Sequence, residues 1–185
     1  MMVSFIQSNY YGFGSGLVVP GTGISLQNRG AGFTLQKGHP NEVGPNKRPF
    51  HTIIPAFLMD GDAPLMSFGV MGGPMPQGHV QMVTRLRDYN QNPQAASDAP
   101  RWQVMGELEV AVETGFRADV LDDLAGRGHR LSESGPQASF AFGGAQLIYR
   151  LPDGYLAASD SRKETAAVCR TPSRKRWPWP RASAP

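Results

Sequence analysis

The sequence predicts an α+β fold in which β-hairpins outnumber parallel strand pairs. Two pairs of apolar, alternating segments are each interrupted by turn residues, Asp60 and Gly61 in the first and Pro152 to Gly154 in the second. Between them, residues 76–90 and 117–125 repeat apolar side chains at three- and four-residue spacing, as amphipathic helices do. With 185 residues and 40% hydrophobic residues, the chain is long and apolar enough for one packed core.

The N-terminal part is expected to consist of short strands and glycine-rich loops. VSFIQS (residues 3–8) alternates apolar and polar side chains and predicts a strand. Residues 9–16 form a glycine-rich loop, and two short strands are expected at 17–19 and 24–26. The glycines, prolines and asparagines of residues 36–49 indicate a surface loop.

The first hairpin is expected to run directly into a helix. Its second strand ends at two adjacent glycines, Gly72 and Gly73. Pro76 suits the first turn of a helix because a residue there needs no hydrogen-bonded N–H. The apolar face that follows predicts a helix to about Asn90, packed on the hairpin.

The remaining elements follow in the same way. Residues 93–100 predict at most a short helix, and residues 108–112 alternate as a strand. The helix at 117–125 is ended by Gly126 and Gly128. Residues 1–162 are therefore expected to form the domain, and residues 163–185, rich in proline and arginine without an apolar repeat, a disordered tail.

Charge is distributed unevenly along the chain. Residues 162–185 hold seven lysine and arginine residues against one acidic residue, while the whole chain has a net charge of +3. Residues 1–161 are therefore mildly acidic and offer no general surface for nucleic acid. One alternative function is a non-catalytic binding module whose basic tail contacts nucleic acid or another anionic partner.

Compartment and cofactors are constrained by what the sequence lacks. Cys169 is the single cysteine, so no intrachain disulfide is expected. No apolar stretch is long enough for a membrane span, and the first residues do not resemble a signal peptide, so we expect a cytoplasmic protein with no membrane partner. The four histidines have no zinc-site spacing, and neither a metal nor another cofactor is expected.

The adjacent glycines are the strongest candidate for chemistry. Without side chains, Gly72 and Gly73 could present two backbone N–H groups to a developing negative charge, as an oxyanion hole requires. The alternative interpretation is that Gly72 and Gly73 only form a tight structural turn. His79, near the start of the expected helix, is interpreted as a packing residue rather than a base.

Four segments, in order, carry a resemblance to a known family. Residues 13–33, 43–57, 68–83 and 155–163 are similar to the small subunit of gamma-glutamyltransferases and their acylase relatives. This resemblance implies an N-terminal-nucleophile hydrolase fold, an αββα sandwich of which residues 1–162 would be the small-subunit portion. It also implies a self-cleaving precursor, a large-subunit portion as partner, and a γ-glutamyl or related carboxyacyl amide as substrate.

The resemblance also implies site residues. The oxyanion hole of the family matches Gly72 and Gly73. Its nucleophile is a threonine whose hydroxyl attacks the amide carbonyl to give an acyl-enzyme, and that threonine matches a position upstream of Met1. We therefore expect this chain to be inactive by itself.

The residues that match the family's acyl-binding pocket differ from the transferases. Arg29 stands where they have a glutamine or glutamate, and His51 and Thr52 stand where they have two serines. Gly32 replaces the aspartate that holds the substrate ammonium, and Asn9 resembles a loop asparagine. An arginine in this pocket favours acyl groups that carry a carboxylate but no α-amine.

Overall fold

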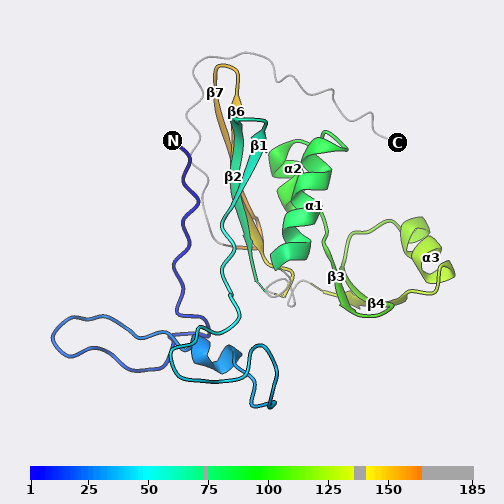
Figure 1. The fold of residues 1–185 in the computed structure, drawn as a ribbon. Coiled ribbons are helices and arrows are strands. Elements are labelled where there is room, and N and C mark those ends of the chain that lie inside the picture. Colours follow the sequence, from blue (N-terminus) through cyan, green and yellow to red (C-terminus); the bar gives the residue numbers. More distant parts are fainter. Residues whose placement is uncertain (73–74, 136–140, 164–185) are drawn as a thin grey trace. The chain divides into compact units, whose positions relative to one another are not determined.

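The computed structural model describes residues 1–72, 75–135 and 141–163 (Figure 1). The chain divides into two compact units. The smaller unit is Phe5–Pro55, and the larger unit contains Met1–Ser4 and the residues from Ala56 onward. Gly73, Cys169 and the expected tail beyond Lys163 lie outside the described residues.

The larger unit is built on a four-stranded antiparallel sheet. Its strands are β1 (Ala56–Asp60), β2 (Ala63–Met71), β6 (Gly144–Leu151) and β7 (Gly154–Ser159), in the order β1-β2-β6-β7. Both predicted hairpins are confirmed. The first turns through Gly61, whose φ of +56° lies in the left-handed region that glycine tolerates.

Two helices cover one face of this sheet, α1 (Met75–Arg87) and α2 (Pro93–Asp98) (Figure 1). The core lies between them and the sheet, and α1 approaches β2 closely because Gly78 has no side chain: a Cβ there would lie 2.7 Å from a methyl of Val70. Asn92 caps the N-terminus of α2, and its side chain accepts a hydrogen bond from the Gln94 amide. The largest buried hydrophobic side chains of this core are Met66, Phe68, Val70, Met82, Leu86, Leu147 and Tyr149.

A second, smaller sheet follows in the same unit. It contains β3 (Trp102–Gly106), β4 (Glu109–Glu113) and β5 (Arg130–Ser134), with α3 (Ala118–Gly126) connecting β4 to β5. β3 and β4 are antiparallel, whereas β4 and β5 are parallel. The strand and helix predicted at 108–112 and 117–125 are confirmed with a one-residue shift, but β3 and β5 are absent from the sequence prediction.

The prediction of a strand at residues 3–8 is wrong, since these residues form no strand. β2 already pairs with β1 on one side and β6 on the other, so it has no free edge for another strand. Residues 3 and 4 instead contact β2 through side chains: the Ser4 hydroxyl donates to the carbonyl of Phe68 at 3.1 Å, and the Ser67 hydroxyl donates to the carbonyl of Val3.

The Phe5–Pro55 unit has little regular structure. Its one helical element is the 3-10 turn η1 (Arg29–Gly32). The two short strands expected at 17–19 and 24–26 are reduced to a single bridge between Val18 and Ser25. None of its residues, all of which the structure describes, is buried.

Candidate functional site

The junction between β2 and α1 contains the glycine that the sequence singled out. β2 ends at Met71, and Gly72 follows with a φ of +119°, a conformation that L side chains rarely adopt. Helix α1 begins at Met75. The predicted strand–glycine–helix junction is therefore present, and its backbone at Gly72 requires glycine.

The neighbouring loop fixes the backbone that leads into Gly72. Gly143 has a φ of +80°, and a Cβ built on it would lie 2.0 Å from the carbonyl oxygen of Met71. Any side chain at 143 would therefore displace this backbone. The next residue, Gly144, pairs with Met71 in the sheet.

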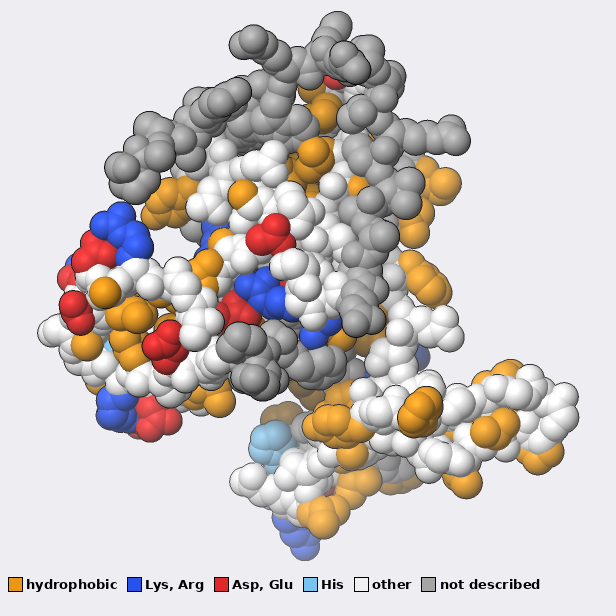
Figure 2. All heavy atoms as spheres, turned by 180° about the vertical axis from the view of Figure 1, so that it is seen from behind, with side chains coloured by type: hydrophobic (Ala, Val, Ile, Leu, Met, Phe, Trp, Pro, Cys, Tyr) orange, Lys and Arg blue, Asp and Glu red, His pale blue; other side chains and the backbone are white. Residues whose placement is uncertain are grey.

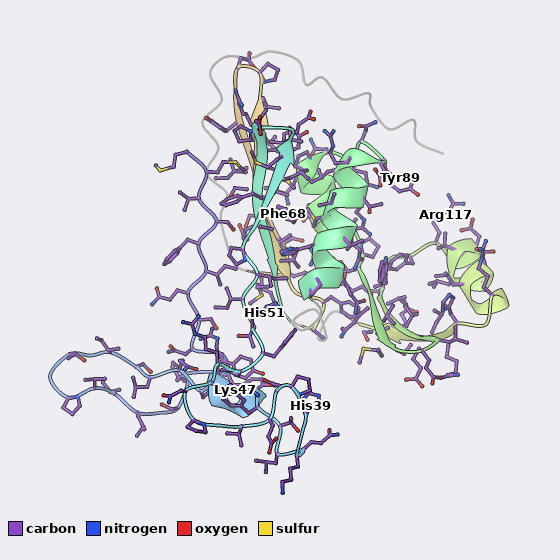
Figure 3. The ribbon with its side chains drawn as sticks, in the orientation of Figure 1. His39, Lys47, His51, Phe68, Tyr89 and Arg117 are labelled. Carbon is purple, nitrogen blue, oxygen red and sulfur yellow. The ribbon has the colours of Figure 1, made fainter. Side chains whose placement is uncertain are left out.

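His79 fastens α1 to the same strand. Its Nε2 accepts a hydrogen bond from the Val70 amide at 3.0 Å, and its ring packs 4.9 Å from that of Phe68, which Figure 3 shows on β2. β1 pairs with β2 only as far as Phe68, so His79 satisfies an amide beyond the end of β1. Burial lowers the pKa of His79, which favours the neutral acceptor form. The interpretation of His79 as a packing residue agrees with these contacts.

A buried ion pair holds the 142–145 segment in place. Arg101 and Asp160 have side chains only 1% and 0% exposed and are hydrogen-bonded to each other. Arg101 also donates to the carbonyls of Phe142 and Gly143, at 3.3 and 3.1 Å, and Asp160 accepts from the Ala145 amide at 2.7 Å. The pair thus positions the loop that packs on the residue before Gly72.

Arg162 extends the pair into a network. Its guanidinium donates to both oxygens of Glu113, at 2.7 and 2.6 Å, and to Asp160 at 3.0 Å. Burial alone would lower the pKa of Arg162, but Glu113 and Asp160 raise it on balance. Sequence reasoning missed Arg101 and Asp160 as supporting residues, although the segment containing Asp160 was part of the resemblance.

In the Phe5–Pro55 unit, the structure brings two of the predicted binding residues together. Arg29 Nε donates to the hydroxyl of Thr52 at 2.8 Å, although 23 positions separate them. Arg29 Nη2 is buried and has no hydrogen-bond partner among the described residues. Arg29 opens the turn η1, whose preceding residue, Asn28, bonds to the loop at 9–14.

The other two predicted binding residues lie in the same unit. His51, labelled in Figure 3, is exposed. Its ring centroid lies 4.6 Å from that of Phe50, with the two rings tilted by 33°. The carbonyl of Asn9 accepts from the Asn28 amide at 3.1 Å, so Asn9 belongs to the loop fastened to the Arg29 turn. Gly32 closes this turn, and a Cβ on it would meet nothing closer than Pro49 at 3.8 Å.

The described part of the chain contains neither a cluster of metal ligands nor a helix suited to a membrane. No group of three or more histidine, cysteine, aspartate or glutamate residues is placed to hold a metal ion there. Among the same residues, no helix combines the length and apolarity that crossing a membrane requires.

Comparisons with known sequences identify the family. The family model described as Gamma-glutamyltranspeptidase matches residues 1–169. The chain is 38% identical over 173 residues to the glutathione hydrolase-like YwrD proenzyme of Bacillus subtilis, covering 90% of this chain and 33% of that protein. It is also 38% identical over 175 residues to the oxamate amidohydrolase proenzyme of Klebsiella pneumoniae, covering 91% and 33%. The chain thus spans about a third of the length of these curated relatives.

Solved structures confirm the fold. The cephalosporin acylase from Bacillus halodurans superimposes with a TM-score of 0.78 at 49% identity, over 86% of this chain and 30% of that one. The gamma-glutamyltranspeptidase from Pseudomonas nitroreducens complexed with L-DON gives 0.77 at 22% identity, over 91% and 93%. The α+β fold is therefore that of the N-terminal-nucleophile hydrolases, as the resemblance implied. The chain belongs to the gamma-glutamyltranspeptidase family.

Proposed function

We propose that these residues are the C-terminal, small-subunit portion of an enzyme that cleaves γ-glutamyl or related carboxyacyl amides through an acyl-enzyme. The observation that carries this proposal is the junction at Gly72. Its φ of +119° and the close contact of Gly143 with Met71 support a backbone held in one conformation before any substrate arrives. Such preorganisation is what electrostatic stabilisation of a transition state needs.

In this mechanism the amides of Gly72 and Gly73 donate hydrogen bonds to the carbonyl oxygen of the scissile amide. Self-cleavage of the precursor first exposes a threonine at a new N-terminus, which frees its α-amine. The threonine hydroxyl attacks the carbonyl carbon, and the hydroxyl proton passes through this α-amine to the leaving amine. Negative charge collects on the oxygen as the tetrahedral intermediate forms, and the two amides stabilise it. Water or an acceptor amine then resolves the acyl-enzyme, regenerating the hydroxyl.

The acyl group would bind to the Phe5–Pro55 unit. Arg29 and Thr52 form a hydrogen-bonded pair there, and Asn9 and His51 belong to the same unit. We propose these four residues as the binding residues for the acyl group. This chain therefore supplies the oxyanion hole and the acyl-binding residues, and the threonine comes from the remainder of the precursor.

The proposed partner is the large-subunit portion of the same precursor, and the four-stranded sheet supplies a face for it. Across the strands, Phe68, Leu147 and Ala158 form one register row and are buried against the helices. The adjacent row runs from Phe57 through Ser67 to Ile148. Phe57 and Ile148 are 51% and 50% exposed, and the Ser67 hydroxyl donates to the carbonyl of Val3. This apolar face, opposite α1 and α2, has the character of a surface that another sheet covers.

The Phe5–Pro55 unit supports the same proposal. It has no buried residue, and its exposed large side chains include Phe5, Phe13, Leu35 and Phe50. Hydrophobic side chains are visible over its surface in Figure 2. A chain segment that buries so little apolar surface gains too little free energy to offset its conformational entropy, so it needs further protein contacts.

Replacing Ile148 by lysine tests the proposed interface. An ammonium group at this position would lose water on association without gaining a partner, so binding to the large-subunit portion should weaken roughly tenfold or more. Copurification of the two portions, followed by titration, measures the effect. Met105→Lys is the matched control because Met105 is 60% exposed on β3, in the other sheet. Equal weakening by both substitutions would contradict the interface.

The activity itself is tested in the full-length precursor that contains these residues. Glutaryl-p-nitroanilide should be hydrolysed with an acyl group transiently attached to the threonine, detectable by mass spectrometry of quenched protein. The 185-residue chain alone should show no turnover. Hydrolysis by this chain without any partner would contradict the proposed division of the active site.

A further inference from the structure

One hydrogen bond crosses the junction at Gly72. The amide of Val70, two residues before Gly72 on β2, donates to Nε2 of His79 on α1 at 3.0 Å. The strand ends at Met71 and the helix begins at Met75, so this bond joins the two sides of the turn that contains Gly72. The bond spans nine positions of the chain and ties the residues before the turn to those after it.

Val70 also fixes α1 through a second, adjacent contact. A Cβ on Gly78 would lie 2.7 Å from a methyl of Val70, so the helix approaches the strand closely because position 78 is glycine. The next helix residue, His79, accepts the Val70 amide, and on the other side of β2 Val70 pairs with Ala145 of β6. Pairing with β6 and the His79 bond thus set the course of β2 from both sides just before Gly72.

The bond requires a neutral His79 ring. Nε2 can accept only when it carries no proton, which places the single ring proton of the neutral form on Nδ1. Burial lowers the pKa of His79, and the Phe68 ring, 4.9 Å away, is part of its apolar surroundings. A protonated ring has two donors and no acceptor, so it could not hold the Val70 amide. The bond is therefore expected at neutral pH and lost in acid.

The elements around the ring contain few ionisable groups. β2, β3 and residues 73–74 and 136–140 have no titratable side chain. Asp60 pairs with Ala63, and Tyr149 with Met66, at the end of the sheet remote from Gly72. Burial is the cause of the lowered pKa of His79, without a contribution from charged groups of the described residues. The titratable side chains on β1, α1, α2, β6 and β7, other than His79 itself, are Asp60, Arg85, Arg87, Asp98, Tyr149, Arg150 and Tyr155.

We propose that His79 is a positioning residue of the oxyanion hole: it accepts the Val70 amide and so holds the Gly72 amide in the direction that the substrate carbonyl oxygen requires. This inference rests on the function proposed above. His79 acts through the backbone in this role and not as a base. Because charge on the carbonyl oxygen develops only in the transition state, a loosened Gly72 amide should slow the chemical step more than it weakens substrate binding.

Two substitutions separate the acceptor from the rest of the ring. In the processed full-length protein, His79→Leu keeps an apolar side chain but removes the acceptor. It should lower kcat for glutaryl-p-nitroanilide roughly 10- to 100-fold, with KM changed less than about twofold. His79→Gln, whose Oε1 accepts a hydrogen bond at about the reach of Nε2, should restore most of kcat. A loss in His79→Leu that glutamine does not restore would overturn the proposal.

The pH profile supplies a readout that a purely structural role would not change. Wild-type kcat should fall in acid as His79 is protonated, below the ordinary histidine pKa of about 6.5, and His79→Gln should lack this step. The ratio of wild-type kcat to that of His79→Gln is therefore constant at neutral pH and decreases in acid. A ratio that stayed constant from about pH 7 to about pH 5 would contradict the role of the neutral ring.

His129→Leu is the matched control, because His129 is another partly buried histidine of the larger unit, between α3 and β5. This variant should keep the kcat and the pH profile of the wild type. An equal loss of kcat in His129→Leu and His79→Leu would overturn the proposal, since it would show that removing any such histidine has the same effect.

Hydrogen exchange, followed by mass spectrometry, separates this inference from the proposed function. The peptide containing Val70 and Gly72 should exchange faster in His79→Leu than in the wild type, while peptides of the second sheet remain unchanged. If exchange rises in this way but the wild type hydrolyses no anilide, the proposed function fails and the hold of His79 on β2 stands. If the wild type hydrolyses the anilide and His79→Leu retains its kcat, the function stands and this inference is overturned.

Discussion

Replacing Asp160 by asparagine is expected to lower the free energy of unfolding by about 3–5 kcal/mol, the usual cost of removing one partner from a buried ion pair. Asp160 is fully buried and accepts hydrogen bonds from Arg101, Arg162 and the Ala145 amide. An amide side chain would leave Arg101, itself 1% exposed, without its anion. Chemical denaturation of the 185-residue chain, followed by circular dichroism, measures the loss.

The same substitution should change how stability depends on pH. Burial alone would raise the pKa of Asp160, but the Ala145 amide and Arg101 lower it on balance. A carboxylate whose pKa is lower in the folded state stabilises the protein above its unfolded pKa, about 4, and this contribution disappears as the pH falls through the folded value. The difference in stability between wild type and Asp160→Asn should therefore be full at neutral pH and shrink in acid.

An exposed aspartate provides the control. Asp123 on α3 pairs with Arg127, the residue that follows the helix, but their side chains are 59% and 69% exposed. Because such surface pairs contribute little, Asp123→Asn should leave the unfolding midpoint near that of the wild type. A loss in Asp123→Asn as large as that in Asp160→Asn would show that burial of the ion pair is not the cause.

The two hairpins and helix α1 can be predicted from the sequence because neighbouring residues alone determine them. The hairpins come from alternation broken at residues such as Gly61, and α1 comes from its three- and four-residue repeat. β5 was not predicted because its sequence, RLSES, is largely polar and lacks an apolar alternation. It also pairs in parallel with β4, 21 positions earlier, and no local signal indicates this pairing. The strand expected at 3–8 fails for the converse reason: its alternation is real, but β2 has no edge left for it.

The candidate site likewise contains one feature that local sequence predicts and others that depend on residues far apart in the chain. The glycine junction is visible in the sequence because a single backbone conformation at Gly72 demands it. Arg101 and Asp160 are 59 positions apart, so no local sequence pattern predicts their ion pair. Charged residues are also rarely buried, so composition does not predict it either. Only the resemblance assigns Arg29 and Thr52 to one pocket; the structure shows that their side chains are hydrogen-bonded.

In the proposed mechanism, replacing Gly72 by alanine should lower the kcat of the processed full-length protein about 10²- to 10³-fold, the usual cost of losing one oxyanion donor. Alanine does not remove the N–H, but it disfavours a φ of +119°, so the backbone should relax and turn the amide away from the carbonyl oxygen. Since the charge on that oxygen develops only in the transition state, KM should change far less than kcat.

The control for Gly72→Ala is Gly106→Ala, at the end of β3, where a Cβ meets nothing within 4 Å and φ is not positive. Its kcat should remain close to that of the wild type. Unfolding midpoints of both variants separate a lost donor from a lost fold, because only a lost donor lowers kcat in a protein that remains folded. If folded Gly72→Ala retained wild-type kcat, the strained conformation at this position would serve only the turn into α1, and the oxyanion would need another source of donors.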